Sequence, residues 1–347
     1  MIPVDLYPTI IHFFPIRDLL DLRLVSRDVK EATRCYDRKV VVNMVTFYSY
    51  EFLRYFPNAK QVFYPLEVND STLDDFVCIR QMGLWSQPSD KMFTKTPRLE
   101  KLQVNRIETI INYRQLTQLR CLSVYGSPIT DEDLSLLKNL TELSLSDCLR
   151  VSTVKGLPQL KKLGMFRMLM MDDGLVGDIE ELSLTQCPNI TKIRLGKLKK
   201  LYLANQALIG DDGVDAESLE DLEIHYPCKI TDQGICKFSQ LVKLYIHQNK
   251  HDFINGDGFR TLRHLKRVSF TQCIIHDLSE VSQVEYLMLF SCTVQNISNM
   301  CEWKLKSLHL LNTIGCELFE DYVAGDLSIT ICPGLTDRHI HREVQRF

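Results

Sequence analysis

One short apolar motif returns along most of this chain, and it limits the possible folds more than any other feature. The motif has the form L-x-x-L-x-L-x-x-N/C and recurs about every 20 residues, about a dozen times, from Leu99 to the C-terminus. An apolar residue at every second position is typical of a short strand, because alternate side chains of a strand point to the same face. One such unit cannot bury its leucines alone, so neighbouring units have to stack. Residues 99–347 are therefore predicted to form a solenoid.

The predicted strands are centred on apolar residues two positions apart. These pairs are Leu102/Val104, Leu122/Val124, Leu143/Leu145, Leu163/Met165, Leu182/Leu184, Leu201/Leu203, Leu222/Ile224, Leu244/Ile246, Val268/Phe270, Leu287/Leu289, Leu308/Leu310 and Leu327/Ile329. Amphipathic helices are the main alternative, but the intervening segments are short and interrupted by Gly and Pro. We expect an α/β solenoid, with a curved parallel sheet and short helices or turns on its convex side.

Cysteine recurs three residues after the second apolar residue of the strand. This position holds Cys148, Cys187, Cys273, Cys292 and Cys332, with Asn249 and Thr313 in other units. Cysteine acts here as a small buried side chain with weak hydrogen-bonding ability. No signal peptide is recognisable before the folded sequence, so we expect reduced thiols in a cytoplasmic or nuclear protein.

The segments between the strands carry polar turns. Ile129-Thr130-Asp131, Gly210-Asp211-Asp212-Gly213-Val214, Ile230-Thr231-Asp232 and Leu335-Thr336-Asp337 are examples. Thr and Asp accept hydrogen bonds from backbone amides at helix starts. Their recurrence predicts caps of short helices rather than a calcium site or an acid/base array.

These phrases resemble the cysteine-containing class of leucine-rich repeats. The resemblance is carried by Cys187-Pro188-Asn189-Ile190-Thr191, Cys228-Lys229-Ile230-Thr231-Asp232 and Cys332-Pro333-Gly334-Leu335-Thr336-Asp337. The resemblance implies a leucine-rich-repeat fold over about 250 residues of the chain. A repeat class alone implies no function.

Residues 1–40 break the period and are predicted to form three short apolar helices. Three helices of this length cannot make a core of their own, so the solenoid or another protein has to cover them. A plain helical cap for the solenoid is one interpretation.

The order of residues in this segment also resembles an F-box. The resemblance is carried by Ile2-Pro3-Val4-Asp5-Leu6, Phe14-Pro15, Asp18-Leu19-Leu20 and Leu22-Arg23-Leu24-Val25-Ser26-Arg27. Val29 stands where the family usually carries Trp, and Pro8 interrupts the first helix. The resemblance implies docking on the Skp-type adaptor of a cullin-RING ubiquitin ligase. The residues implied in this contact are Pro3, Leu6, Ile10, Phe14, Pro15, Leu19, Leu20, Leu24 and Val25.

Residues 41–98 are expected to join the two modules as an N-terminal cap with degenerate repeats. Strands are predicted at residues 39–42 and at Ala59-x-x-Val62-x-Tyr64, with a helix at residues 47–56 between them. A loop is predicted over residues 82–88, where Trp85 either contacts a substrate or packs against the cap.

The alternate strand positions predict which side chains face a substrate. Most are small and polar, but the later repeats carry an aromatic and apolar group. It consists of Tyr202, His225, Tyr245, His247, Met288, Phe290 and His309. Exposed aromatics clustered on one surface are typical of protein contacts, although aromatic residues are also good strand formers.

Charge and motifs exclude several functions. The formal net charge of −3 gives no general attraction to nucleic acid or anionic membranes. Basic runs such as residues 194–200 are interpreted as solvated edges, with a site for a phosphate compound as the alternative. Phosphate loops, G-x-S-x-G and H-E-x-x-H are absent, as is CxxC, and Cys332 with His339 and His341 lacks the spacing of a zinc site. We expect no catalysis, no metal and no cofactor.

The combined expectation is a non-catalytic substrate receptor. The F-box-like segment would bind a Skp-type adaptor, and through it a cullin-RING ligase, while the repeats hold a protein substrate. The alternative is a scaffold or decoy that binds the adaptor or another protein without ubiquitin transfer. A small anionic cofactor under the concave surface is a third and weaker option.

Overall fold

The computed structural model describes residues 41–43, 61–64, 79–85, 88, 92–108, 111–248, 257–281, 283–297, 303, 305–315 and 326–330. The F-box-like residues 1–40 and the helix predicted at 47–56 lie outside them. The chain divides into two compact units. Unit 1 comprises Met1–Val151 and Gly156–Leu160, and unit 2 comprises Ser152–Lys155 and Lys161–Phe347.

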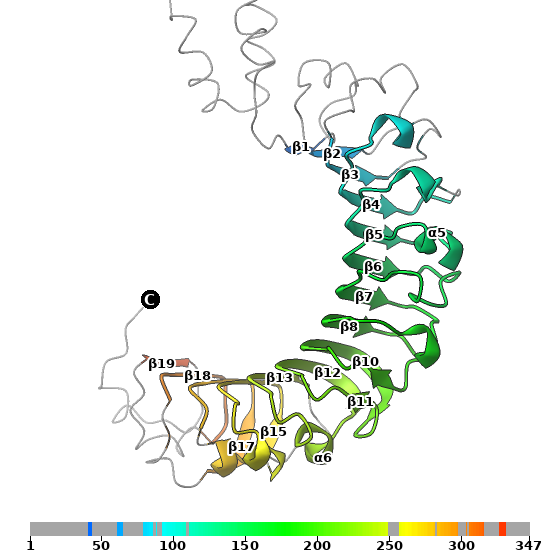
Figure 1. Cartoon of the computed structure of the whole chain (residues 1–347). Helices are drawn as coiled ribbons and strands as arrows, with labels where there is room; N and C mark the ends of the chain where they lie inside the picture. The colour runs from blue at the N-terminus through cyan, green and yellow to red at the C-terminus, as the bar shows by residue number, and fades with distance from the viewer. Residues whose placement is uncertain are drawn as a thin grey trace, which may run out of the picture. The chain divides into compact units, whose positions relative to one another are not determined.

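Unit 1 is built on parallel strands that pair in the order of the sequence. These are β1 (Val41–Asn43), β2 (Gln61–Tyr64), β3 (Gln81–Leu84), β4 (Lys101–Asn105), β5 (Cys121–Tyr125) and β6 (Glu142–Ser146). Short helical segments connect them on one side (Figure 1). They are η4 (Phe93–Lys95), η5 (Tyr113–Gln115) and α5 (Asp131–Ser135).

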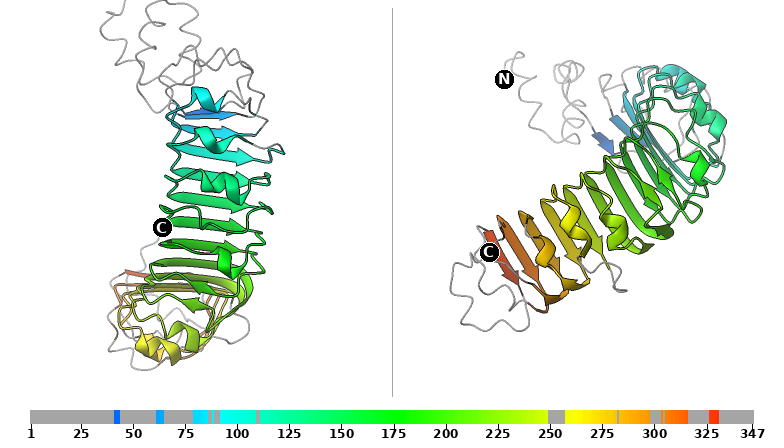
Figure 2. Two further views of the ribbon diagram at one scale, coloured as in Figure 1. Left: turned by 45° about the vertical axis from the view of Figure 1, so that its right-hand side comes forward. Right: turned by 60° about the horizontal axis from the view of Figure 1, so that its bottom comes forward.

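Unit 2 repeats this plan with parallel strands along one side and short segments along the other (Figures 1 and 2). The main sheet contains β7 (Lys162–Phe166), β8 (Glu181–Thr185), β10 (Lys200–Gly210), β12 (Asp221–Lys229), β13 (Lys243–His247), β14 (Arg267–Thr271), β16 (Tyr286–Phe290), β18 (Ser307–Leu311) and β19 (Asp326–Thr330). Behind it lie η6 (Asp172–Gly174), α6 (Asp232–Ile235), η7 (Asp257–Thr261) and η8 (Ser279–Val281). Two small parallel sheets pair β9 (Ile193–Arg194) with β11 (Val214–Asp215) and β15 (Ile274–Asp277) with β17 (Thr293–Asn296).

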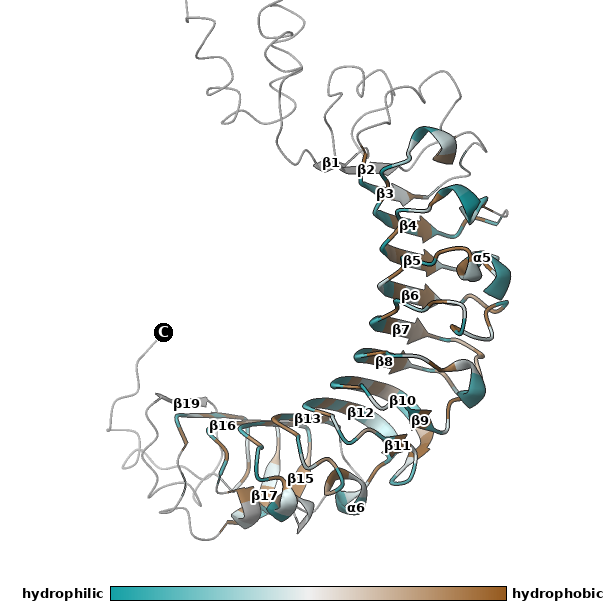
Figure 3. Cartoon of the chain, viewed as in Figure 1, coloured by the Kyte–Doolittle hydropathy of each residue, from teal (hydrophilic) through white to brown (hydrophobic). Residues whose placement is uncertain are grey.

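The predicted apolar pairs from Leu102/Val104 to Leu308/Leu310 are buried in the cores of the two units, and the strands that carry them are coloured as hydrophobic in Figure 3. Leu201 pairs in register with Leu222, and Leu203 with Ile224, and all four are buried. The same register continues along the sheet of unit 2. Each apolar residue therefore packs between its equivalents in neighbouring repeats, about 4.8 Å away. The structure confirms the stacked strands predicted from the motif.

The loop predicted over residues 82–88 is wrong in its first half, which forms β3. Met82 and Leu84 are buried and lie in register with Leu102 and Val104 of β4. The repeat continues here with Met82 in place of the usual Leu, and Trp85, 39% exposed, follows the strand. The strands predicted near residues 39–42 and 59–64 are confirmed as β1 and β2.

The recurring cysteines in the described ranges, Cys148, Cys187, Cys273 and Cys292, lie buried where the chain leaves a strand, as predicted. Sγ of Cys187 donates to the backbone oxygens of Thr185, at 3.5 Å, and of Met165 one repeat earlier, at 3.6 Å. Cys148, Cys273 and Cys292 make the equivalent pair of contacts. Burial raises the pKa of the Cys187 thiol. Asn249 and Cys332 lie outside the described residues.

Polar side chains join the turns between strands. Thr130 caps α5 in a reciprocal capping box with Asp133, and Thr231 caps α6, as predicted. Asp172 accepts hydrogen bonds from the amide and hydroxyl of Thr191 at 2.7 and 2.6 Å, and Asp211 does the same for Thr231 at 2.6 and 2.7 Å. These carboxylates bind the next repeat rather than forming an acid/base array.

Candidate protein-binding surface

The exposed side of the main sheet in unit 2, here called the strand face, carries three rows of side chains. A strand of period two sends alternate residues to this side, and the parallel register lines up equivalent positions. The first row is Lys200, Asp221, Lys243, Arg267, Tyr286 and Ser307. The middle row is Tyr202, Glu223, Tyr245, Ser269, Met288 and His309. The third row is Ala204, His225, His247, Thr271, Phe290 and Leu311.

All seven residues predicted to bind a substrate lie on the strand face, where six of them form two groups and Phe290 lies on β16 outside both. Tyr202, His225 and His247 make up the first. The ring of His225 stacks on that of His247, with centroids 4.0 Å apart and planes at 9°, while Tyr202 lies 5.1 Å from His225. Burial lowers the pKa of His247, and the neighbouring His225 lowers it further, although Glu223 opposes the change.

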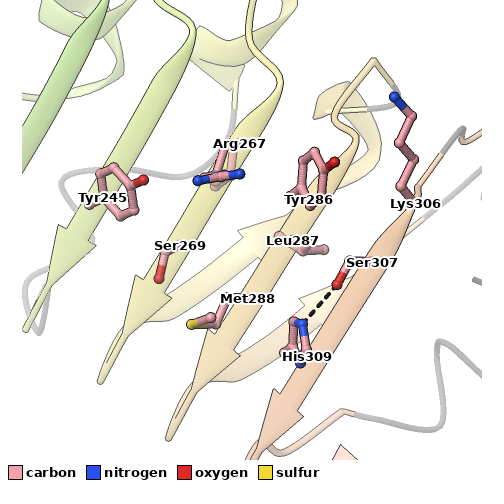
Figure 4. Close-up of a pocket in the computed structure, with 10 residues that line it drawn as sticks. Tyr245, Arg267, Ser269, Tyr286, Leu287, Met288, Lys306, Ser307 and His309 are labelled. Carbon is pink, nitrogen blue, oxygen red and sulfur yellow. Dashed lines mark hydrogen bonds between the residues drawn. The ribbon is translucent and has the colours of Figure 1, made fainter. Parts of the chain in front are cut away.

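Tyr245, Met288 and His309 belong to the second group, which lines an open hollow of about 530 Å³. Figure 4 shows their side chains projecting from neighbouring strands with those of Arg267 and Tyr286. The Arg267 guanidinium carbon lies 4.8 Å from the centre of the Tyr286 ring, a cation–π distance. Nε2 of His309 is 2.7 Å from Oγ of Ser307. The hollow thus combines aromatic and aliphatic surface with a cation.

Sequence reasoning missed Arg267, Tyr286 and Ser307. It counted surface positions only from the first motif leucine onward. Each missed residue stands one position before that apolar residue, and therefore two positions before a predicted surface residue. Extending the period-two count backward by one step would have found all three.

The apolar part of the surface is concentrated on β16. Tyr286, Met288 and Phe290 are 36%, 45% and 41% exposed, and their alternation places them side by side on the strand face. Leu287 and Leu289 between them are buried in the core. One strand therefore presents a ridge of three large side chains to solvent.

Ion pairs link the first row and the turns before it across neighbouring repeats. Lys200 lies 2.9 Å from Glu181, Lys197 lies 2.6 Å from Asp178, and Lys306 lies 2.6 Å from Glu285. The basic run at residues 194–200 thus meets carboxylates of the preceding repeat, in agreement with its interpretation as a solvated edge.

The predicted adaptor-binding residues, from Pro3 to Val25, all lie outside the described part of the chain, as do Cys332, His339 and His341. None of the seven cysteines in the described ranges forms a disulfide bond. None of the helices in the described ranges is both long enough and apolar enough to cross a membrane.

No protein-family model matches the chain, and no curated protein matches it in sequence. Among solved structures, TLR13 in complex with ssRNA13 is similar, with a TM-score of 0.53, 17% identity and 80% of this chain covered. This chain spans about half of that one, 51% of its length. An internalin, InlF, from Listeria monocytogenes has a TM-score of 0.48 and 19% identity, and the match covers 88% of this chain and 89% of the internalin.

The repeat geometry and the structural match lead to the same fold. Parallel strands in one register and a buried apolar ladder recur with the period of the motif, and several strand exits carry a buried cysteine or threonine. The TLR13 structure has a similar backbone over most of this chain. The chain therefore has the leucine-rich-repeat fold.

Proposed function

We propose that the strand face of unit 2 binds a partner protein and that the chain is a non-catalytic receptor. The observation that carries this proposal is the exposed ridge of Tyr286, Met288 and Phe290 beside the hollow of about 530 Å³. Large apolar side chains and arginine grouped around a hollow have the composition of protein-interface hot spots. A partner that covers this ridge gains the burial of three large side chains.

The charge distribution favours a protein partner over a nucleic acid. The structural neighbour TLR13 was solved with ssRNA13, but this chain has a formal net charge of −3. Lysines of the first row and of the adjacent turns pair with carboxylates, as Lys200 does with Glu181. Binding to a phosphate backbone depends on cations that displace counterions, and these lysines are already engaged.

The finer proposal is that this receptor serves a Skp-cullin-F-box ubiquitin ligase. The support is the F-box-like order of residues 2–27 ahead of the repeats. The N-terminal segment would bind the Skp-type adaptor in the cytoplasm or nucleus, and unit 2 would hold the substrate. Ubiquitin transfer would then depend on proximity, because tethering raises the effective concentration of a substrate lysine near the conjugating enzyme.

Co-expression of the full chain with a Skp-type adaptor and a cullin tests the finer proposal. We expect both proteins to co-purify with the full chain. Leu20→Asp should abolish adaptor binding, because a charge replaces a contact-forming leucine, and should leave the circular dichroism spectrum unchanged. Phe290→Ala is the matched control, and it should retain the adaptor.

The other outcomes of this experiment distinguish the alternatives. Adaptor without cullin would indicate a decoy, and neither protein would indicate a repeat scaffold with a helical cap. Equal adaptor binding by wild type and by both Leu19→Asp and Leu20→Asp would contradict the docking assignment.

A further inference from the structure

Three potential metal ligands meet on the strand face of unit 2, between β12 and β13. Glu223 and His225 are two positions apart on β12, so their side chains leave the same face of the strand. His247 on β13 is the register partner of His225. The sheet therefore brings two imidazoles and one carboxylate together. From the sequence no metal was expected, because the chain lacks zinc-binding spacings such as CxxC and H-E-x-x-H.

The donor atoms of these residues are already close to the spacing of a ligand shell. Nε2 of His225 and Nε2 of His247 lie 2.8 and 3.6 Å from Oε1 of Glu223. One donor atom of each residue lies within 4.8 Å of the other two. Around zinc, with bonds of about 2.1 Å, tetrahedral ligand atoms are roughly 3.4 Å apart. Rotations of the side chains can bridge these differences while the strands stay in place.

The two rings have room for such rotations. They stack with planes at 9°, whereas a metal lies close to the plane of each imidazole that binds it. Metal binding would therefore rotate the two imidazole rings out of their parallel arrangement. The side chains of His225 and His247 are 33% and 23% exposed, so solvent borders both rings.

The nearby lysine does not compete with the two histidines for the Glu223 carboxylate. Lys243, on the neighbouring strand, pairs with Asp221 at 3.3 Å. Glu223 instead has its short contacts with His225 and His247. A carboxylate between two imidazoles supplies one anionic and two neutral donors, the mixture that zinc accepts in open sites.

We propose that Glu223, His225 and His247 bind one zinc ion. Three protein ligands leave a fourth coordination position open. Because all three side chains rise from the sheet, the open position faces away from it, toward water or toward a ligand on a bound molecule. The site requires neither a partner protein nor a ubiquitin ligase, so its test is independent of the function proposed above.

Zinc titration of the full chain tests the site. The protein is stripped with a chelator and titrated with zinc chloride in a calorimeter, beside His225→Ala, His247→Ala and Glu223→Gln. The matched control is His309→Ala, a histidine of the same face outside the triad. Because the chain has 12 cysteines and 9 histidines, the readout is the difference between each variant and the control.

We expect wild type and His309→Ala to bind one more equivalent of zinc than His225→Ala and His247→Ala. Glu223→Gln keeps the side-chain shape but removes the anionic ligand. It should lower the affinity for this zinc ion by at least about 10-fold, the smallest effect expected from loss of a residue that only supports a ligand. Circular dichroism should stay unchanged, because all three side chains are partly exposed. Equal zinc binding by wild type and all three variants would overturn the proposal, and so would an equal loss in His309→Ala.

Cobalt substitution provides a second readout. Co²⁺ in the site should give four-coordinate d–d absorption without a thiolate charge-transfer band, and this absorption should disappear in His247→Ala. A spectrum dominated by thiolate charge transfer and unchanged in His247→Ala would assign the metal to cysteines and contradict the site.

Discussion

The residue after each strand determines how the chain leaves the sheet. Asp147, Arg167, Gln186, Gln272 and Asn312 are among those with positive φ at this position, and Gly126 stands there after β5. The amides of Gly126, Arg167 and Gln186 extend the strand pairing, and so does the amide of Gln272, which donates to the backbone oxygen of Phe290 at 2.8 Å. Non-glycine residues pay a steric cost in this conformation, least for short polar ones. Glycine, asparagine and aspartate therefore fit this position best, whereas Arg167, Gln186 and Gln272 adopt it at a steric cost.

Substitution of Gln272 tests this corner. Gln272→Gly should leave stability within about 1 kcal/mol of wild type, because glycine adopts positive φ without a steric cost. Gln272→Val should destabilise by roughly 1–2 kcal/mol, because a β-branched side chain is strained there. Denaturation midpoints in urea measure both, with Thr271→Val in the adjacent extended strand as the control. Equal stability of the Gly and Val variants would contradict the explanation.

Thr313 shows what the cysteine position requires. Its hydroxyl donates to the backbone oxygens of Leu289 and Leu311 at 3.1 and 3.2 Å, the contacts that Sγ makes in other repeats. Thr313→Val keeps the shape but loses the donor, so we expect a loss of about 1 kcal/mol. Thr313→Cys should lose less. A urea midpoint for the Cys variant at or below that of the Val variant would show that size alone matters.

At the scale of elements, the sequence predicted those that the repeat motif describes and missed those that it does not. The leucine pairs predicted the strands, because burial on one side imposes period two. β3 was missed because Met82 and Gly83 obscure the motif. β9 and β11 were missed because two residues are too few to show a period. The triad of Glu223, His225 and His247 was missed because it depends on which residues of neighbouring strands lie side by side. The repeat period predicted that these side chains face outward but was not used to pair them across strands.

Asp172 links η6 to the next repeat, and its protonation should weaken the link. Burial pushes the pKa of Asp172 up, but the hydrogen bonds from Thr191 and Lys192 outweigh it and hold the pKa below its usual value. A carboxylate whose pKa is lower in the folded state adds stability above its unfolded pKa of about 3.9 and loses it as pH falls.

Asp172→Asn is therefore expected to cost roughly 1.5–3 kcal/mol at pH 7, because charge-assisted hydrogen bonds are lost. The difference in free energy of unfolding between wild type and Asp172→Asn should become smaller as the pH falls below about 3.9. Asp173→Asn, at the exposed neighbouring position, is the control and should stay close to wild type. Urea denaturation across this pH range measures the effect. A gap that stays constant down to pH 2 would contradict the role of the charge.

At the scale of the whole molecule, different parts of the chain are proposed to have different tasks. The F-box-like segment is proposed to bind an adaptor, and the strand face of unit 2 is proposed to hold a partner. Sequence alone predicted that Met288 and Phe290 face outward, because their positions in the repeat require it. It did not predict the hollow beside them, because its shape depends on side chains from β13 to β18.

Quantitative affinity purification tests the central claim, that the strand face of unit 2 binds a protein, most directly. The full chain is compared with Met288→Glu/Phe290→Glu, which places charges on the ridge. The control is Leu169→Glu/Met171→Glu, which changes two apolar residues of unit 2 that are 51% and 58% exposed outside the strands. We predict a protein that is retained by wild type and by the control, lost from the ridge variant, and able to bind the purified chain directly. An identical set of bound proteins in all three samples would contradict the claim.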